Sequence, residues 1–343
     1  MTDSERSLRL VDVAEAAGVS LATASRSMAG RDGVSTSVAA HVRAVAASLG
    51  YIPNAHARAL AGSAQPMVGL IVHDVSDPYF AEIARGLLRV AEERGMMVLI
   101  NQSERSSDTE LARIRTLRAQ QVGAIVLAGS GYVEPELEAD ATAELRGHIE
   151  SGGRAALVGR HHIPVDAVLP ANRPGGATAA AHLAELGHRR IAVIAGDPRL
   201  CTVADRLAGV RAGAKKAGLD PGAVVVLESA FSREGGAQAA HRLRTEYPDV
   251  TGVVALSDVM AMGALSELRS AGVSVPGDVS LVGFDDVTVA ADLAPALTTI
   301  RLPMAEMGAL ALEMTFGPRA EKPRRRRTSH TLVVRDSTAP PRR

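Results

Sequence analysis

The alternation of short apolar runs with helical stretches over residues 67–284 restricts the fold more than any other feature of the sequence. Eight runs rich in Val, Ile, Leu and Ala have the pattern of buried strands, and amphipathic helical segments lie between most of them. Strands and helices that alternate at this spacing form βαβ units, and therefore parallel sheets. This number of strands over this length fits two doubly wound lobes better than one. The expected strands span residues 67–72, 97–101, 123–128, 155–159, 190–196, 224–229, 252–257 and 280–284.

The first fifty residues carry a different pattern, that of three short helices. Residues 10–28 form two apolar-faced helical segments separated at Gly18, a residue that readily adopts the positive φ of a tight turn. Ser20 stands at the N-cap position of the second segment, and Ser35 at that of a third, which Gly50 terminates. The pattern fits a helix-turn-helix, whose second helix enters the DNA major groove, and it fits an ordinary αα-hairpin equally well.

Charge and cysteine usage limit the class of protein. The chain has 38 basic and 38 acidic residues, and residues 1–63 carry six arginines against five acidic residues, so net charge does not support DNA binding. The single cysteine, Cys201, excludes an intrachain disulfide and fits a reducing compartment. The chain begins with no apolar signal segment and contains no apolar run of about 18 residues. We therefore expect a soluble cytoplasmic protein without a membrane partner.

Motifs of the common enzyme classes are absent from the sequence. It contains no G-x-G-x-x-G, no G-x-x-x-x-G-K-[ST] and no G-x-S-x-G, and the adjacent His161 and His162 have no partners at metal-ligand spacing. A Ser-His-Asp arrangement is not excluded by counting residues, but we expect no enzyme, no catalytic residues, no metal and no cofactor. A free-standing sugar-binding protein fits residues 64–343 as well as a regulator does.

The residue sequence of the N-terminal helices and of the segment that follows decides between a regulator and a free-standing sugar-binding protein. VAEAAGVS at residues 13–20 and GYIPNAHARALAG at residues 50–62 resemble the DNA-binding headpiece and hinge of the LacI/GalR family of bacterial transcription regulators. The resemblance continues in order to the end of the chain, and covers essentially all of it. It includes DPYFAEI at 77–83, LGHRRIAVIAG at 186–196, DRLAG at 205–209, LVGFDD at 281–286, LTTIRLP at 297–303 and LVVRDST at 332–338.

This resemblance implies an all-α helix-turn-helix headpiece plus an α/β core of two doubly wound parallel-sheet lobes of periplasmic-binding-protein type. The function implied is that of a sequence-specific DNA-binding transcription regulator, expected to be a repressor, whose operator affinity is controlled by a small polyhydroxylated effector such as a sugar. The chain has no C-terminal leucine heptad, so a homodimer is expected. The implied domains are a headpiece at 1–50, a hinge helix or linker at 51–63 and an effector-binding and dimerisation core at 64–343, with a first lobe at about 64–165 and 294–325 and a second at about 166–293 and 326–343.

The resemblance places the operator DNA contacts on the second helix, at the start of the third, and in the hinge. The hinge segment is too short for a stable isolated helix, and its leucine is expected to wedge between base steps in the minor groove. Arg9, Ala29 and Val38 replace residues that are usually polar in the family, which should weaken contacts to the DNA backbone unless Arg9 compensates with its charge. The expected DNA-binding residues are Ser20, Leu21, Ala22, Thr23, Ser25, Arg26, Ser35, Asn54, Ala57 and Leu60.

Effector contacts are expected beyond the carboxyl ends of the core strands, where open parallel sheets bind their ligands. Polar residues follow most of these strands, and carboxylates with arginines suit a polyhydroxylated ligand. Leu200 stands where purine-binding members of the family carry an arginine, which favours a sugar. Arg206 and Asp285 could instead have structural roles, and Phe231 and one of Tyr79 and Phe80 could be core residues. The expected ligand-binding residues are His73, Tyr79, Phe80, Arg160, Thr202, Arg206, Phe231, Ser257 and Asp285.

The basic run at 321–327, EKPRRRR, precedes the last apolar segment of the chain. We expect it to be a solvated loop and not a second DNA contact.

Overall fold

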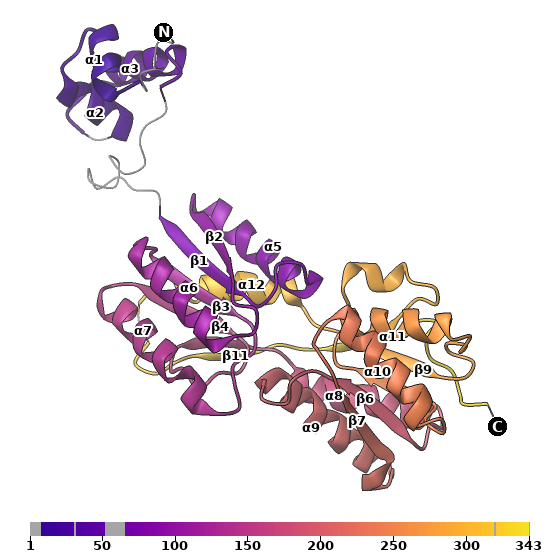
Figure 1. Ribbon diagram of the computed structural model, residues 1–343. Coiled ribbons are helices and arrows are strands. Elements are labelled where there is room, and N and C mark those ends of the chain that lie inside the picture. The colour runs from indigo at the N-terminus through magenta and orange to yellow at the C-terminus, as the bar shows by residue number, and fades with distance from the viewer. Residues whose placement is uncertain (1–7, 31, 52–65, 319, 343) are drawn as a thin grey trace, which may run out of the picture. The chain divides into compact units, whose positions relative to one another are not determined.

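The computed structural model describes residues 8–30, 32–51, 66–318 and 320–342 (Figure 1). The chain divides into two compact units, Met1–Pro66 and Met67–Arg343. The expected hinge residues Asn54, Ala57 and Leu60 lie outside the described residues, so the hinge remains a prediction.

The N-terminal unit contains the three predicted helices, α1 (Leu10–Ala16), α2 (Leu21–Ala29) and α3 (Thr36–Ser48). Gly18 has a φ of +65° in the turn between α1 and α2, and the Ser20 hydroxyl accepts a hydrogen bond from the Thr23 amide at 3.1 Å. Both features follow from the residue types, because glycine tolerates positive φ and serine caps a helix N-terminus. The core of this unit is small and built from Val13, Ala14, Ala17, Ala24, Val42 and Ala46.

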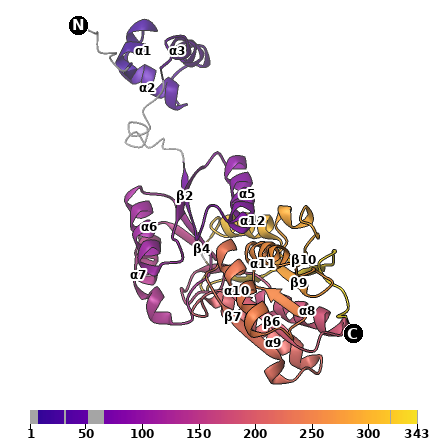
Figure 2. The ribbon, with the colours of Figure 1, turned by 45° about the vertical axis from the view of Figure 1, so that its right-hand side comes forward.

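The first lobe of the core is built on a six-stranded parallel sheet of order β11-β5-β4-β3-β1-β2. Helices α5 and α12 cover one face, and α6 and α7 cover the other (Figure 2). The elements are β1 (Met67–Val72), α5 (Pro78–Glu93), β2 (Met97–Gln102), α6 (Ser107–Ala119), β3 (Ala124–Ala128), η1 (Pro135–Glu138), α7 (Ala139–Glu150), β4 (Arg154–Val158), β5 (Asp166–Leu169), α12 (Met304–Glu313) and β11 (Arg325–Arg327).

The second lobe is built on a sheet of order β12-β10-β9-β8-β6-β7, in which only β12 runs antiparallel among the described strands. Helices α8 and α9 pack on one face, and α10 and α11 on the other. The elements are α8 (Asn172–Glu185), β6 (Ile191–Ala195), α9 (Cys201–Lys216), η2 (Pro221–Ala223), β7 (Val224–Glu228), α10 (Arg233–Glu246), β8 (Gly252–Ala255), α11 (Asp258–Ser270), β9 (Ser280–Asp285), η3 (Thr288–Ala291), β10 (Thr298–Arg301) and β12 (Thr331–Val333). The predicted fold class, with two parallel-sheet lobes, is therefore confirmed.

The lobe boundaries differ from those expected at two strands. The sequence places Asp166–Leu169 in the second lobe, but this strand, β5, pairs with β4 in the first. It places Thr298–Arg301 in the first lobe, but this strand, β10, pairs with β9 in the second. The chain crosses between lobes just after each of these strands and again after β11, so each crossing lies a few residues beyond the position expected. Strand pairing decides the lobe of such a short segment, and pairing partners leave no signal in the local sequence.

The expectation of a loop at 321–327 was wrong in part. Arg325–Arg327 form the edge strand β11, because they pair in parallel with Ala167–Leu169 of β5. All three arginine side chains are exposed. Charged residues on an edge strand discourage unwanted pairing with other strands, which gives this basic run a structural role. Among the described residues, no helix combines the length and apolar character that crossing a bilayer requires.

Helix pairs in the core approach each other closely at glycines. A β-carbon on Gly236 of α10 would overlap the carbonyl group of Met260 in α11, and one on Gly86 of α5 would overlap Ala305 at the start of α12. Such contacts leave no room for a side chain, so the spacing of each helix pair depends on these glycines.

We predict that Gly236→Leu destabilises the core by about 1 to 3 kcal/mol, because an overpacked helix pair must move apart. Gln238→Leu adds the same side chain at an exposed position of the same helix and serves as the control. Chemical denaturation followed by circular dichroism measures both, and equal midpoints for the two variants would contradict the close-packing explanation.

Candidate functional site

The N-terminal unit exposes the face of α2 that the sequence assigns to DNA. Ser20, Leu21, Ala22 and Arg26 are exposed, and Leu21 keeps 52% of its surface accessible, which is high for a leucine. Ala24 is buried in the small core, so the helix orientation is set by packing on the opposite side. An exposed N-terminal half of a second helix is the geometry that helix-turn-helix proteins present to the major groove.

The other predicted DNA-binding residues of this unit fall around the same helix and the start of α3. Thr23 and Ser25 are half-buried on α2, and the Thr23 hydroxyl lies 2.9 Å from that of Ser20. Ser35 is exposed and caps α3 by accepting a hydrogen bond from Val38 at 3.4 Å. The Ser20 and Ser35 hydroxyls therefore already accept helix-capping hydrogen bonds. Among the predicted DNA contacts of this unit, Arg26 is the exposed side chain with the most hydrogen-bond donors for a base edge.

A pocket lies between the two lobes of the core, beyond the carboxyl ends of their strands. It brings together seven of the nine predicted effector contacts, namely His73, Tyr79, Phe80, Thr202, Arg206, Phe231 and Asp285. The first three come from the first lobe and the other four from the second. The remaining lining residues are Asp77, Arg105, Gly129, Ser130, Gly159, Leu200 and Val203.

An ion pair between Arg206 and Asp285 forms the second-lobe wall of this pocket. The Arg206 Nη2 atom lies 2.7 Å from Asp285 Oδ1, its Nε donates to Asn172 at 2.9 Å, and its Nη1 donates to the carbonyl of Leu256. The guanidinium also stacks on the ring of Phe284 at 3.8 Å. Both charged side chains are almost wholly buried, and burial raises the pKa of Asp285 to about 7 despite the opposing effect of Arg206.

The first-lobe wall contributes a neutral imidazole and two aromatic rings. His73 Nε2 accepts a hydrogen bond from the Ser130 amide at 2.8 Å, so its Nδ1 carries the proton and faces the Ser103 hydroxyl at 2.9 Å. Burial, Arg105 and His161 lower the pKa of His73 to about 3. The Phe80 ring packs edge-on against both His73 and Tyr79. The wall thus offers polar atoms of fixed direction between apolar surfaces.

Two pocket residues that the sequence did not single out form a second charge pair. Arg105 Nη2 lies 3.5 Å from Asp77 Oδ2, and Arg105 Cζ lies 5.0 Å from the ring centroid of Phe231 in the other lobe. Asp77 also caps α5 by accepting a hydrogen bond from the Tyr79 amide at 3.0 Å. An aspartate before Pro78 is an N-cap signal, but nothing in the sequence shows that Arg105 turns back toward the pocket.

The remaining two predicted contacts, Arg160 and Ser257, do not line the pocket. Arg160 makes a bidentate ion pair with Asp205 of α9, with Nε to Oδ2 at 2.9 Å and Nη2 to Oδ1 at 3.0 Å. Ser257 is buried and caps α11 by accepting a hydrogen bond from Met260 at 3.2 Å. Each side chain therefore already has a structural partner.

One side of the pocket is closed by a seam between residues 130–133 of the first lobe and 199–202 of the second. The amide of Thr202 donates to the Ser130 hydroxyl at 2.9 Å, and the Cys201 thiol donates to the carbonyl of Tyr132 at 3.0 Å. Backbone hydrogen bonds join the two segments at 2.7 and 2.8 Å. The lobes are thus bonded to each other on this side, whereas Arg105 and Phe231 meet only by stacking.

The free space in the pocket is about 30 Å³. Ligand cavities usually measure about 300 to 1,000 Å³, so a sugar ring enters only when the lobes or the Arg105 side chain move apart.

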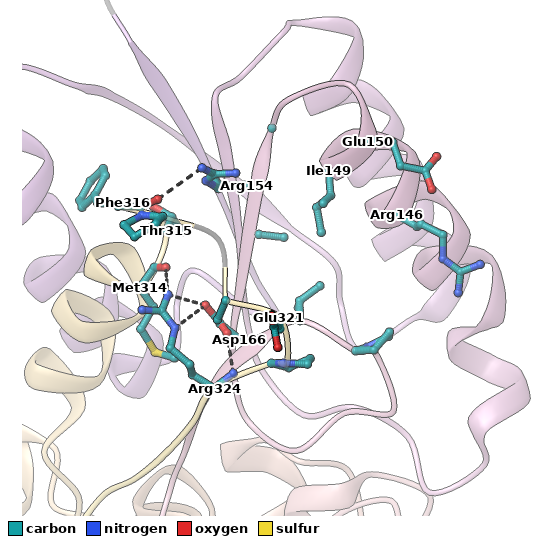
Figure 3. Close-up of a pocket in the computed structure, with 18 residues that line it drawn as sticks. Arg146, Ile149, Glu150, Arg154, Asp166, Met314, Thr315, Phe316, Glu321 and Arg324 are labelled. Carbon is teal, nitrogen blue, oxygen red and sulfur yellow. Dashed lines mark hydrogen bonds and ion pairs between the residues drawn. The ribbon is translucent and has the colours of Figure 1, made fainter.

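A different pocket, of about 340 Å³, lies at the amino ends of β4 and β5 (Figure 3). Three of its charged side chains already have partners: Arg324 Nε donates to Asp166 at 2.9 Å, and Arg154 donates to the carbonyl of Gly317 at 3.3 Å. None of the predicted effector contacts lies there, so we do not assign the effector to it. Among the described residues, no group of three or more His, Cys, Asp or Glu is placed to hold a metal ion.

A buried polar cluster supports the first-lobe wall from behind. His161 Nδ1 lies 2.6 Å from Glu138 Oε1, and His161 Nε2 faces the carbonyl of Gly129, a pocket residue, at 3.3 Å. Both ring nitrogens face acceptors, which indicates a protonated imidazole, and its pKa is raised by Glu138 against the effect of burial. Glu110 is also buried near this cluster, and burial raises its pKa to about 7 while His161 opposes the rise.

Comparisons with known proteins assign the chain to a family. The family described as bacterial regulatory proteins, lacI family, matches residues 9–54, and a periplasmic binding protein-like domain matches residues 180–338. The HTH-type transcriptional regulator DegA of Bacillus subtilis (strain 168) is 32% identical over 338 residues, which cover 96% of this chain and 98% of DegA. The chain belongs to the lacI family of bacterial regulatory proteins. It is a DNA-binding transcription regulator.

Two solved structures extend the comparison of this lacI-family regulator to its fold. The structure of the transcriptional regulator CelR–cellobiose complex is 30% identical, with 96% of this chain and 99% of that chain covered and a TM-score of 0.69. The lac repressor dimer bound to operator and the anti-inducer ONPF is 26% identical, with 97% and 100% covered and a TM-score of 0.83. The resemblance inferred from the sequence is thereby confirmed.

We predict that Glu110→Gln flattens the pH dependence of the regulator's stability. The folded pKa of about 7 exceeds the ordinary 4.5, so between these values the folded state keeps a proton that the unfolded state has lost. The free energy of unfolding therefore decreases as pH rises from 4.5 to 7, by up to about 1.4 kcal/mol per pH unit from this group.

Denaturation of both proteins at several pH values measures the effect. The wild type should lose stability relative to the variant across this window, and parallel curves would show that Glu110 is not held protonated. Glu150→Gln changes an exposed carboxyl on the adjoining helix α7 and serves as the control.

Proposed function

We propose that this regulator binds a palindromic operator as a homodimer in the cytoplasm and represses transcription, and that a sugar bound between the core lobes controls its operator affinity. The observation that carries the proposal is the interlobe pocket, in which paired charges and aromatic rings from both lobes converge. A ligand that touches both lobes stabilises one lobe arrangement over another, and only such a difference can alter DNA affinity. The proposal includes no catalytic step.

The chemistry of the pocket supports a neutral polyhydroxylated ligand. Its charges are balanced, since Arg206 faces Asp285 and Arg105 faces Asp77. Carboxylates accept hydrogen bonds from hydroxyl groups, while guanidinium groups donate to them, so the pairs offer both functions without net charge. The aromatic rings that line the pocket suit the apolar faces of a ring-shaped ligand. The related CelR structure contains cellobiose, which supports a sugar as effector.

An exposed apolar edge of the first lobe supports a homodimer. β2 is an edge strand, and its residues Met97 and Ile100 are 46% and 45% exposed, while Leu88 on the neighbouring helix α5 is 43% exposed. Exposed apolar residues on an edge strand favour association with another protein surface, and a second copy of this chain provides such a surface. The related lac repressor structure is a dimer on its operator, and two headpieces in one dimer would read two half-sites.

We predict that Arg26→Ala lowers specific operator affinity by about 1 to 3 kcal/mol per half-site through the loss of a base contact. Arg43→Ala removes the same charge from an exposed position of α3 outside the predicted contact residues, and should cost much less. Footprinting and fluorescence anisotropy on the operator measure both variants. An asymmetric single site, or equal losses for the two variants, would contradict the paired-headpiece proposal.

We predict that Asp285→Asn abolishes the response of operator binding to sugar while leaving sugar-free operator binding unchanged. The amide keeps an oxygen acceptor for Arg206 but removes the charged acceptor for a sugar hydroxyl. Asp286→Asn is the control, because Asp286 pairs with Arg301 and Arg335 outside the pocket.

A thermal-shift screen of neutral sugars first identifies the effector, since a ligand at 100 times its dissociation constant adds about 2.7 kcal/mol of stability. Operator affinity is then measured with and without that sugar. A full response in Asp285→Asn would remove Asp285 from the effector site, and the absence of any stabilising sugar would overturn the proposed effector class.

A further inference from the structure

We propose that the effector has two sugar units, one in the pocket between the lobes and a second in an adjoining outer cavity, with Arg105 as the gate between them. This inference rests on the proposed function, because it takes the effector to be a sugar. It adds a second binding site and restricts the effector to a disaccharide or a larger glycoside.

The outer cavity lies directly against the pocket between the lobes. Its volume is about 540 Å³, against about 30 Å³ for the inner pocket, and both are lined by Arg105, Leu200 and Phe231. These three side chains are therefore the partition between the two spaces. The outer cavity falls within the size range of ordinary ligand sites, which is about 300 to 1,000 Å³. A ligand that displaces the partition gains one continuous space open on the outer side.

Arg105 is held in the partition by its backbone and not by its side chain. Glu104 and Arg105 both have a φ of +56°, a left-handed conformation that is unfavourable for residues other than glycine. The turn persists because the Glu104 amide donates to the carbonyl of His73 at 2.9 Å and the Tyr132 hydroxyl donates to the carbonyl of Arg105 at 3.0 Å. Strain of this kind is retained where the position of a side chain matters.

The guanidinium of Arg105 is only weakly engaged. Within the part of the chain that the structure describes, it forms one ion pair, with Asp77 at 3.5 Å, lies in the field of Asp74, and makes no hydrogen bond. Its other contact is the Phe231 ring. The N–H groups of this guanidinium are therefore open to acceptors on either side of the partition. No hydrogen bond with a described residue has to break when this side chain moves aside, and its N–H groups can then donate to oxygens of a ligand.

The Phe231 ring packs directly on the backbone of Gly196, which follows β6. A β-carbon on Gly196 would overlap the Phe231 ring, so the ring lies against bare backbone and forms a flat floor common to both spaces. A flat aromatic floor between two spaces is suited to the apolar face of a sugar ring on each side of a glycosidic bond.

The outer cavity also carries polar groups that lack partners. The Glu228 side chain is exposed and forms no ion pair with any described residue. The Ser229 hydroxyl oxygen is buried beside this cavity and has no hydrogen-bond partner among the described residues, so it can meet a ligand once the partition moves aside. Asp197 and Arg199 pair with each other at 2.6 Å, so they add no net charge. An exposed carboxylate beside a buried hydroxyl without a partner matches the donors and acceptors of a second sugar unit when the cavity opens.

Titration calorimetry of the full-length protein tests this inference with D-glucose, D-galactose, cellobiose, maltose, lactose and melibiose. We expect at least one disaccharide to bind at least 10-fold more tightly than either of its component monosaccharides. A monosaccharide that binds as tightly as every disaccharide tested would overturn the second site while leaving the proposed function intact. Binding of no sugar in the panel would overturn the proposed sugar effector, and the second site with it.

Variants of the outer cavity locate the second unit. Glu228→Gln and Ser229→Ala should each lower affinity for the preferred disaccharide by at least 5-fold and leave affinity for its inner monosaccharide within 2-fold. Glu185→Gln alters an exposed carboxyl of α8 outside both cavities and controls for the loss of charge. Equal disaccharide affinities in Glu228→Gln, Ser229→Ala and the control would contradict the assignment.

A substitution at Arg105 tests its role as the gate between the two cavities. Arg105→Lys keeps the positive charge but lacks the planar group that stacks on Phe231 and donates in several directions. We expect it to lower disaccharide affinity more than monosaccharide affinity. An equal loss for both sugars would show that Arg105 acts only in the inner pocket, and no loss would remove it from the site.

Discussion

The buried guanidinium of Arg206 is the interaction on which the second lobe and its pocket wall depend. A charge with 2% of its side chain exposed is stable only when its donors are satisfied. Its partners come from three places, Asn172 at the start of α8, the carbonyl that follows β8 and Asp285 at the end of β9. The same contacts therefore tie strand ends together and place a carboxylate in the pocket. The pair that ties these strand ends together is therefore also the pair to which we propose that the effector binds.

The two lobes are joined unequally around this pocket. The seam between residues 130–133 and 199–202, together with the ion pair of Arg160 with Asp205, bonds them on one side. On the other side, Arg105 stacks on Phe231, and no hydrogen bond between described residues joins the lobes there. The weak contact between Arg105 and Phe231 permits opening there, while the three chain crossings after β5, β10 and β11 keep the lobes covalently joined. This is the type of hinged movement by which a ligand between lobes selects one arrangement.

The sequence predicted the elements and many of the pocket residues because these depend on local rules. Arg206 could be found because it lies in the family-like motif DRLAG, and Asp285 because it ends a buried strand, and the ends of parallel strands converge. Arg160 and Ser257 satisfied the same rule but do not line the pocket. Asp205 engages Arg160, and the N-terminus of α11 engages Ser257. Whether a polar side chain at a strand end faces the pocket or bonds to a structural partner depends on tertiary neighbours, which residue spacing does not reveal.

The parts that the sequence did not predict depend on unusual backbone or on pairing over long distances. Arg105 reaches the pocket through two consecutive left-handed residues, neither of which is glycine. Strands β5 and β10 changed lobes relative to expectation because β4 and β9 pair with them. The headpiece was easier to predict, since its caps at Ser20 and Ser35 and its turn at Gly18 involve residues close in sequence.

We propose that effector binding in the pocket and operator binding are linked through the lobe arrangement. The most direct test measures the affinity of the identified sugar for the full-length protein, alone and saturated with operator DNA, beside the operator affinity with and without sugar. Linkage requires the two ratios to be equal, and a coupling of about 5- to 150-fold is expected. Sugar affinity that is unchanged by saturating operator would contradict the account.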